Sequence, residues 1–101
     1  MKIIVLARRR EEVPMEAIQP HVKEEIQAVW DLYVKGECRE FYTRADQPGP
    51  AILMVEYASI PEAQKSLANL PLVALNMIDL ELIPLAPFVG IERLFQVPSP
   101  S

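Results

Sequence analysis

The order of apolar patterns along the 101-residue chain predicts an α+β fold with one four-stranded antiparallel sheet and two helices on the same face. Two continuous runs rich in Ile, Val and Leu are typical of central strands. Two segments have the period of an amphipathic helix, and two others alternate with the period of two that partly exposed strands show. In chain order, the six segments span residues 2–7, 20–35, 37–44, 51–57, 59–70 and 77–83.

The first half of the chain predicts a central strand, a helical turn and a long helix. The apolar run at residues 2–7 ends where residues 8–12 become solidly charged, which indicates a solvated loop. Residues 13–19 favour a helical turn, and Pro20 either kinks this turn or begins the long helix as its first residue. Gly36 is suited to cap that helix, because glycine readily adopts the left-handed conformation of a helix end.

The second half predicts a hairpin, a short helix and a last strand. Residues 37–44 carry polar groups on both faces, as expected of a strand at a sheet edge or beside a cavity. The proline- and glycine-rich stretch 46–50 indicates the hairpin loop. Ser59 and Glu62 have the spacing of a capping box at the start of the short helix. Residues 77–83 then put apolar and acidic side chains on opposite faces of an exposed antiparallel strand.

Strand, helix, strand, strand, helix, strand is the order of a ferredoxin-like βαββαβ sandwich, expected over residues 1–84. Right-handed crossovers would put the first and third strands in the middle of the antiparallel four-stranded sheet, with both helices on one face. The opposite sheet face then has nothing in this part of the chain to cover it.

The remaining C-terminal extension, residues 85–101, carries six large apolar side chains after Leu85, among several prolines. It is too apolar to remain in water and too interrupted for a regular element. We expect it to pack on a neighbouring subunit. The alternative is that it folds back over its own sheet.

Length and composition restrict the function further. The chain is short enough that self-association would help its modest core. A net charge of −4 and a pI near 4.9 argue against binding nucleic acid or an anionic membrane. No apolar run approaches the about 18 residues of a transmembrane helix, and no signal peptide is recognisable, so a cytoplasmic location is expected. With one histidine, one cysteine and three glycines, the chain predicts no metal and no cofactor.

The long helix carries the most informative residue, Glu25. A helical wheel gathers the large apolar side chains of this helix on one arc, and Glu25 falls inside that arc while the other charges lie outside it. An unpaired buried charge costs several kcal/mol, so this carboxylate must be paired, neutralised or used. His21 lies four residues earlier, near the edge of the same face. The arc comprises Val22, Ile26, Val29, Trp30, Leu32 and Tyr33.

Two stretches of sequence carry a family resemblance. Residues 67–85, LANLPLVALNMIDLELIPL, and residues 23–42, which include KEE and KGECREFY, together resemble muconolactone isomerase and its relatives in the dimeric α/β-barrel superfamily. The most specific part is Leu-Pro-Leu at 70–72 followed by Asp-Leu-Glu-Leu at 79–82. The resemblance implies a cytoplasmic homodimer or larger ring in which two sheets pair face to face. It also implies aromatic catabolism, in which a cofactor-free enzyme moves a double bond in an unsaturated lactone.

The resemblance also implies roles for two residues. Aligned through Gly36, the family's proton-transfer acid falls on Glu25, and a family arginine that holds a substrate carboxylate falls on Arg39. Cys38 stands where the family has a tryptophan, and the loop at residues 73–76 is longer, so the pocket is expected to differ in shape.

The chemistry of such an isomerase suits these residue types. Removing a proton next to a carbonyl needs a base whose pKa approaches about 7, and desolvation raises a glutamate toward that value. Arg39 would orient an anionic substrate, Tyr42 would donate to the developing enolate, and His21 would relay the proton. Alternatively, Glu25 and Arg39 form a buried ion pair, and Tyr42 and His21 are ordinary residues at a pocket edge.

Three functions follow from these patterns. The first is a muconolactone isomerase-like enzyme that shifts a proton in a small unsaturated lactone or acid, with a small anionic organic molecule as its ligand. The second is a non-catalytic ligand-binding or oligomeric module of the same fold. The third is a cofactor-free monooxygenase of the superfamily, which would favour an aromatic-lined pocket.

Overall fold

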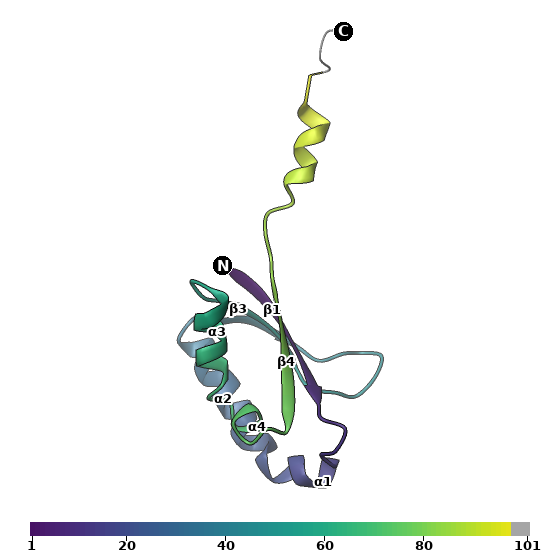
Figure 1. The fold of residues 1–101 in the computed structure, drawn as a ribbon, viewed down its shortest axis with the longest axis vertical. Coiled ribbons are helices and arrows are strands. Elements are labelled where there is room, and N and C mark those ends of the chain that lie inside the picture. Colours follow the sequence, from purple (N-terminus) through teal and green to yellow (C-terminus); the bar gives the residue numbers. More distant parts are fainter. Residues whose placement is uncertain (98–101) are drawn as a thin grey trace.

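The computed structural model describes residues 1–97 and has the predicted order of strands and main helices, with short helices between them (Figure 1). The elements are β1 (Lys2–Arg9), α1 (Met15–Ile18), the 3₁₀ helix η1 (Gln19–His21), α2 (Val22–Val34), β2 (Cys38–Tyr42), β3 (Ile52–Glu56), α3 (Ile60–Leu67), α4 (Pro71–Ala74), β4 (Ile78–Pro84) and the 3₁₀ helix η2 (Val89–Phe95).

The four strands form one antiparallel sheet in the order β2-β3-β1-β4. The two most apolar strands, β1 and β3, therefore lie in the middle, as the sequence predicts. In their register Ile3 lies opposite Val55, and Val5 lies opposite Leu53. This α+β architecture with an open antiparallel sheet is compatible with the ferredoxin-like sandwich.

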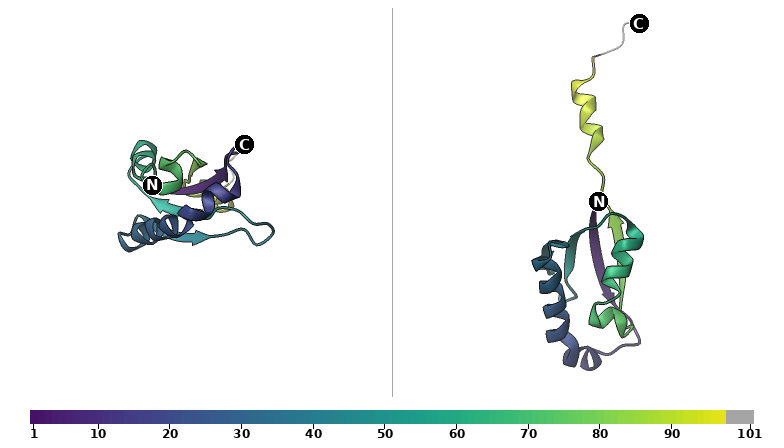
Figure 2. Two further views of the ribbon diagram at one scale, coloured as in Figure 1. Left: turned by 90° about the horizontal axis from the view of Figure 1, so that it is seen from below. Right: turned by 90° about the vertical axis from the view of Figure 1, so that its left-hand side faces the viewer.

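The core lies between one face of the sheet and the helices. Every second residue of the central strands points to this side, and these side chains are almost fully buried. Leu32 of α2 and Leu67 of α3 pack into the same cluster, so both helices cover the same sheet face (Figures 1 and 2). The buried members of the cluster are Ile3, Val5, Leu32, Cys38, Leu53, Val55, Ala63, Leu67 and Leu70.

Local sequence signals explain the ends of the main helices. Gly36 has a φ of 81° just after α2, as a helix-capping glycine does. The Ser59 hydroxyl accepts a hydrogen bond from the Glu62 backbone N–H at 3.3 Å, which confirms the predicted cap of α3. Pro20 lies inside η1, between α1 and α2, so it kinks the chain there and does not begin the long helix.

The buried side of α2 differs from the predicted apolar arc. Leu32 is buried and Val29 partly buried, but Ile26, Trp30 and Tyr33 are 63%, 50% and 44% exposed. The helix contacts β2 at the edge of the sheet and α4 on its other flank, and no described element covers the side that faces away from both. A helical wheel gives the direction of each side chain but not the extent of the neighbouring elements, and this explains the difference.

Within residues 1–97, no helix covers the opposite face of the sheet (Figures 1 and 2). Its centre is apolar, and its margin carries charges that lie opposite one another across the strands, such as Lys2 with Glu56 and Arg8 with Asp79. We call this surface the open sheet face. Its central side chains are Ile4, Leu6, Ile52, Met54 and Ile83.

Residues 85–97 extend beyond the body of the molecule (Figure 1). They contain η2, a regular element that the sequence did not predict, and they do not fold back over the chain's own sheet. Phe88 and Leu94 are 80% and 78% exposed. Residues 98–101 of the predicted extension lie outside the described residues.

Candidate functional site

Glu25 lies on the inner side of α2 and is partly buried. Its Oε1 accepts a hydrogen bond from the backbone N–H of Leu72 at 2.9 Å, at the start of α4. Desolvation raises the pKa of the Glu25 carboxyl above its ordinary value of 4.5, and the hydrogen bond from Leu72 opposes this rise in part. The inward acid predicted from the sequence is therefore present, and it also ties α4 to α2.

Glu25 has no cationic partner among residues 1–97. The ion pairs in that part of the chain are Met1 with Glu56, Arg10 with Asp79, and Arg44 with Asp46. The alternative of a buried ion pair between Glu25 and Arg39 is not formed within one chain. Burial of this carboxylate without a counter-ion is the reason its proton affinity rises.

His21 lies near Glu25 in the fold, at the start of the same helix. It is the residue immediately before α2, it ends η1, and it is partly buried. Its position four residues before Glu25 puts the two side chains about one helical turn apart, on neighbouring parts of one helix face.

Arg39 and Tyr42 lie on β2, apart from this end of α2. Arg39 is the extra residue of a β-bulge between Cys38 and Glu40, and its side chain is exposed. Tyr42 lies opposite Ile52 on the open sheet face, and its hydroxyl donates to Glu40 Oε2 at 3.1 Å. This bond raises the pKa of the Tyr42 phenol. Within one chain, the sheet separates Tyr42 from Glu25.

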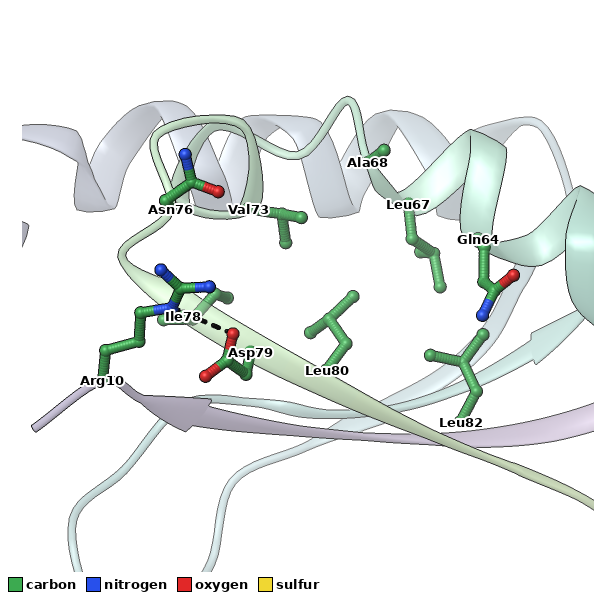
Figure 3. A pocket seen from close by; sticks show the side chains of 10 residues that line it. All are labelled: Arg10, Gln64, Leu67, Ala68, Val73, Asn76, Ile78, Asp79, Leu80 and Leu82. Carbon is green, nitrogen blue, oxygen red and sulfur yellow. Dashed lines mark hydrogen bonds and ion pairs between the residues drawn. The ribbon is translucent and has the colours of Figure 1, made fainter.

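A pocket of about 210 Å³ lies between β4 and the helices α3 and α4 (Figure 3). Its wall combines apolar side chains, such as Leu67 and Val73, with polar ones, such as Gln64 and Asn76. At one end Arg10 Nε donates to Asp79 Oδ1 at 3.0 Å. The sequence analysis missed this pair because it treated the charges at residues 8–12 as solvated, and only the pairing of β1 with β4 brings Asp79 alongside.

A second pocket, of about 190 Å³, lies between α2 and α3. A chain of hydrogen bonds ends at its wall: the Tyr57 hydroxyl donates to Ser66 Oγ at 3.0 Å, and the Ser66 hydroxyl donates to Glu37 Oε1 at 3.4 Å. The sequence analysis missed this chain too, since no local pattern links its three residues. Neither of these two pockets is lined by Glu25 or by an aromatic side chain.

Three further features bear on the type of site. Within residues 1–97, no three His, Cys, Asp or Glu side chains gather in a way that would hold a metal ion. In the same part of the chain, no helix has the length and apolar character needed to cross a membrane. Cys38 is buried in the core, and burial raises the pKa of its thiol, so it lacks the character of a nucleophile.

Comparisons with known proteins do not identify a family. No model of a known protein family matches the chain, and no curated protein matches it. The resemblance to the muconolactone isomerases therefore remains a prediction from the sequence segments quoted above.

Proposed function

We propose that the protein is a cofactor-free isomerase, similar to muconolactone isomerase, that shifts a proton in a small unsaturated lactone or acid. The observation that carries this proposal is the inward carboxylate of Glu25, which is partly buried, has no cation beside it and has a raised pKa. A carboxylate of this kind holds a proton more strongly than an exposed one and is better matched to proton transfer near neutral pH.

In the proposed reaction, Glu25 removes a proton from the carbon next to the lactone carbonyl. The electrons of that C–H bond form a dienolate, and Glu25 becomes a neutral acid. Return of the proton to the far end of the dienolate moves the double bond, so the product is an isomer of the substrate and no oxidant is needed. His21, one turn earlier on the same helix face, is the proposed relay that exchanges the proton with solvent.

Arg39 and Tyr42 remain proposed contacts for the substrate carboxylate and the enolate. Arg39 suits the carboxylate because its planar guanidinium offers two parallel donors. Tyr42 lies on the open sheet face and Glu25 on the helix side of the sheet, so the two side chains do not meet within one chain.

We further propose that the protein is a cytoplasmic homo-oligomer in which two open sheet faces pair into a dimeric α/β barrel. The support is the uncovered apolar centre of that face, with Leu6 and Met54 among its side chains. Its margin carries both acidic and basic residues, such as Glu56 and Arg8, which suits contact with a second copy of the same surface.

Proton exchange measured by NMR tests the catalytic proposal. An unsaturated γ-lactone with an acetic acid side chain is incubated in D₂O with the wild type, Glu25→Gln and, as a matched control, the exposed neighbour Glu24→Gln. We expect Glu25→Gln to slow deuterium incorporation by at least about 100-fold, the usual scale of general acid–base catalysis. Glu24→Gln should match the wild type. Retained exchange in folded Glu25→Gln would refute the role of Glu25.

A second candidate is a non-catalytic oligomeric module of the same fold. It is favoured by the bond from the Leu72 N–H to Glu25, which gives the carboxylate a structural task, and by the absence of Glu25 from both pockets. This candidate predicts an intact oligomer that exchanges no lactone proton in the wild type.

A further inference from the structure

The C-terminal arm, which we define as residues 85–97, has one apolar side. A 3₁₀ helix has three residues per turn, so side chains three apart line up along η2. Phe88, Ile91 and Leu94 form one such row, which is wholly apolar, and the next row consists of Val89, Glu92 and Phe95. The third row is formed by Gly90, Arg93 and Gln96, so the arm is apolar along one whole row and at both ends of the next.

Another exposed apolar surface lies on the outer side of α2. Trp30 and Tyr33 stack with their ring centroids 5.2 Å apart, and Phe41 of β2 meets Tyr33 edge to face at 5.5 Å. Ile26 precedes Trp30 by one helical turn on the same side. We call these four residues the aromatic patch, and each is at least 44% exposed.

The arm and the patch match in length and charge. The seven residues of η2 extend about 14 Å at the rise of a 3₁₀ helix, and the stretch of α2 from Ile26 to Tyr33 extends about 11 Å. Glu92 and Arg93 give the arm one charge of each sign, and exposed Lys23 lies one helical turn before Ile26, where it can meet Glu92.

The arm leaves the body on the far side from its own patch. It continues from β4, and the Leu85 N–H donates to the Lys2 carbonyl at 2.9 Å, which fixes its base beside β1. The patch lies at β2, the opposite edge of the sheet, three strand spacings or about 14 Å away. The arm points away from the body (Figure 2). A second copy is therefore the better source of the arm that covers this patch.

We propose that the apolar side of the C-terminal arm packs on the aromatic patch of a second copy of this chain. Each copy then donates one arm and accepts one, and both exposed apolar surfaces are removed from water. This docking does not depend on a catalytic role for Glu25, and it uses a surface other than the open sheet face.

Trp30 is the only tryptophan of the chain, so its fluorescence reports on the patch directly. The full-length protein is diluted over a wide concentration range while the emission maximum and the molar mass, from light scattering, are recorded. The same series is run on the double variant Phe88→Ser, Phe95→Ser. Leu75→Ser is the control, since Leu75 is an exposed apolar residue outside both surfaces.

For the wild type and Leu75→Ser, we expect Trp30 emission at shorter wavelength in the associated protein and a shift to longer wavelength on dilution. The arm variant should emit at the longer wavelength throughout and need at least about tenfold higher concentration to associate. An arm variant that matches the wild type in both readouts would overturn the proposal. A wild-type emission maximum that depends on the arm but not on concentration would also overturn it, because the arm would then cover its own patch.

Discussion

The two sides of α2 reverse the usual distribution of residues on a helix. The inner side presents the carboxylate of Glu25 to the α4 turn, whereas the outer side leaves Trp30 half exposed and stacked on Tyr33. An amphipathic helix normally buries its aromatic residues and exposes its acids. The exposed aromatic residues are not explained by the stability of one isolated chain, and the bond from Leu72 compensates the burial of Glu25 only in part.

Each side therefore indicates a separate task. Burial of Glu25 without a counter-ion disfavours its ionised form, which suits a group that takes up and releases a proton. Exposure of Trp30 leaves apolar surface in water, which suits contact with another chain. The contribution of α2 to the core comes from buried Leu32 and from the partly buried Ala28 and Val29.

The largest expected effect is on the free energy of unfolding, and it distinguishes the buried side of α2 from its outer side. Leu32→Ala should lower the free energy of unfolding by about 2–5 kcal/mol, because it leaves a cavity in the main cluster. Trp30→Ala should cost only about 0.5–1.5 kcal/mol at concentrations where the chain is monomeric, since chiefly the stacking on Tyr33 is lost. Urea unfolding of both variants measures the difference. Equal losses would mean that Trp30 belongs to the core.

A smaller effect is expected on the inner side. Glu25→Ala removes the acceptor for the buried Leu72 N–H and should cost about 1–3 kcal/mol. Glu25→Gln keeps a carbonyl acceptor and removes the charge, so its free energy of unfolding at neutral pH should equal or exceed that of the wild type. Urea unfolding at pH 7 compares the free energies of unfolding of the two variants. A Glu25→Gln variant as unstable as Glu25→Ala would show that the charge itself is needed at this position.

Local patterns were sufficient to predict most of the fold. The alternation at residues 77–83 gave the two faces of β4, with Ile78 inward and Asp79 outward. Gly36 and Ser59 predicted the ends of two helices, because capping depends on a few neighbouring residues. The α+β class and the central position of β1 and β3 followed from the most apolar runs.

The contacts of the candidate site were less predictable because they join distant segments. The acceptor role of Glu25 depends on Leu72, 47 residues later, and on where α4 lies against α2. The exposure of Trp30 depends on how far β2 and α4 extend around the helix. Sequence periodicity contains neither piece of information, so the inward direction of Glu25 was predicted but its partner was not.

The central claim, that Glu25 is an inward carboxyl with raised proton affinity, is tested most directly by a ¹³C NMR titration of its side-chain carboxyl, assigned by comparison with Glu25→Gln. We predict a midpoint above 4.5. Folding then favours the protonated form, so the stability that this group contributes is present below its unfolded pKa and is lost as the pH rises through the folded value. As the pH rises from the unfolded to the folded pKa of Glu25, the wild type should lose this contribution to its free energy of unfolding. Glu25→Gln has no carboxyl at this position and should not. A midpoint at or below 4.5 would contradict the account.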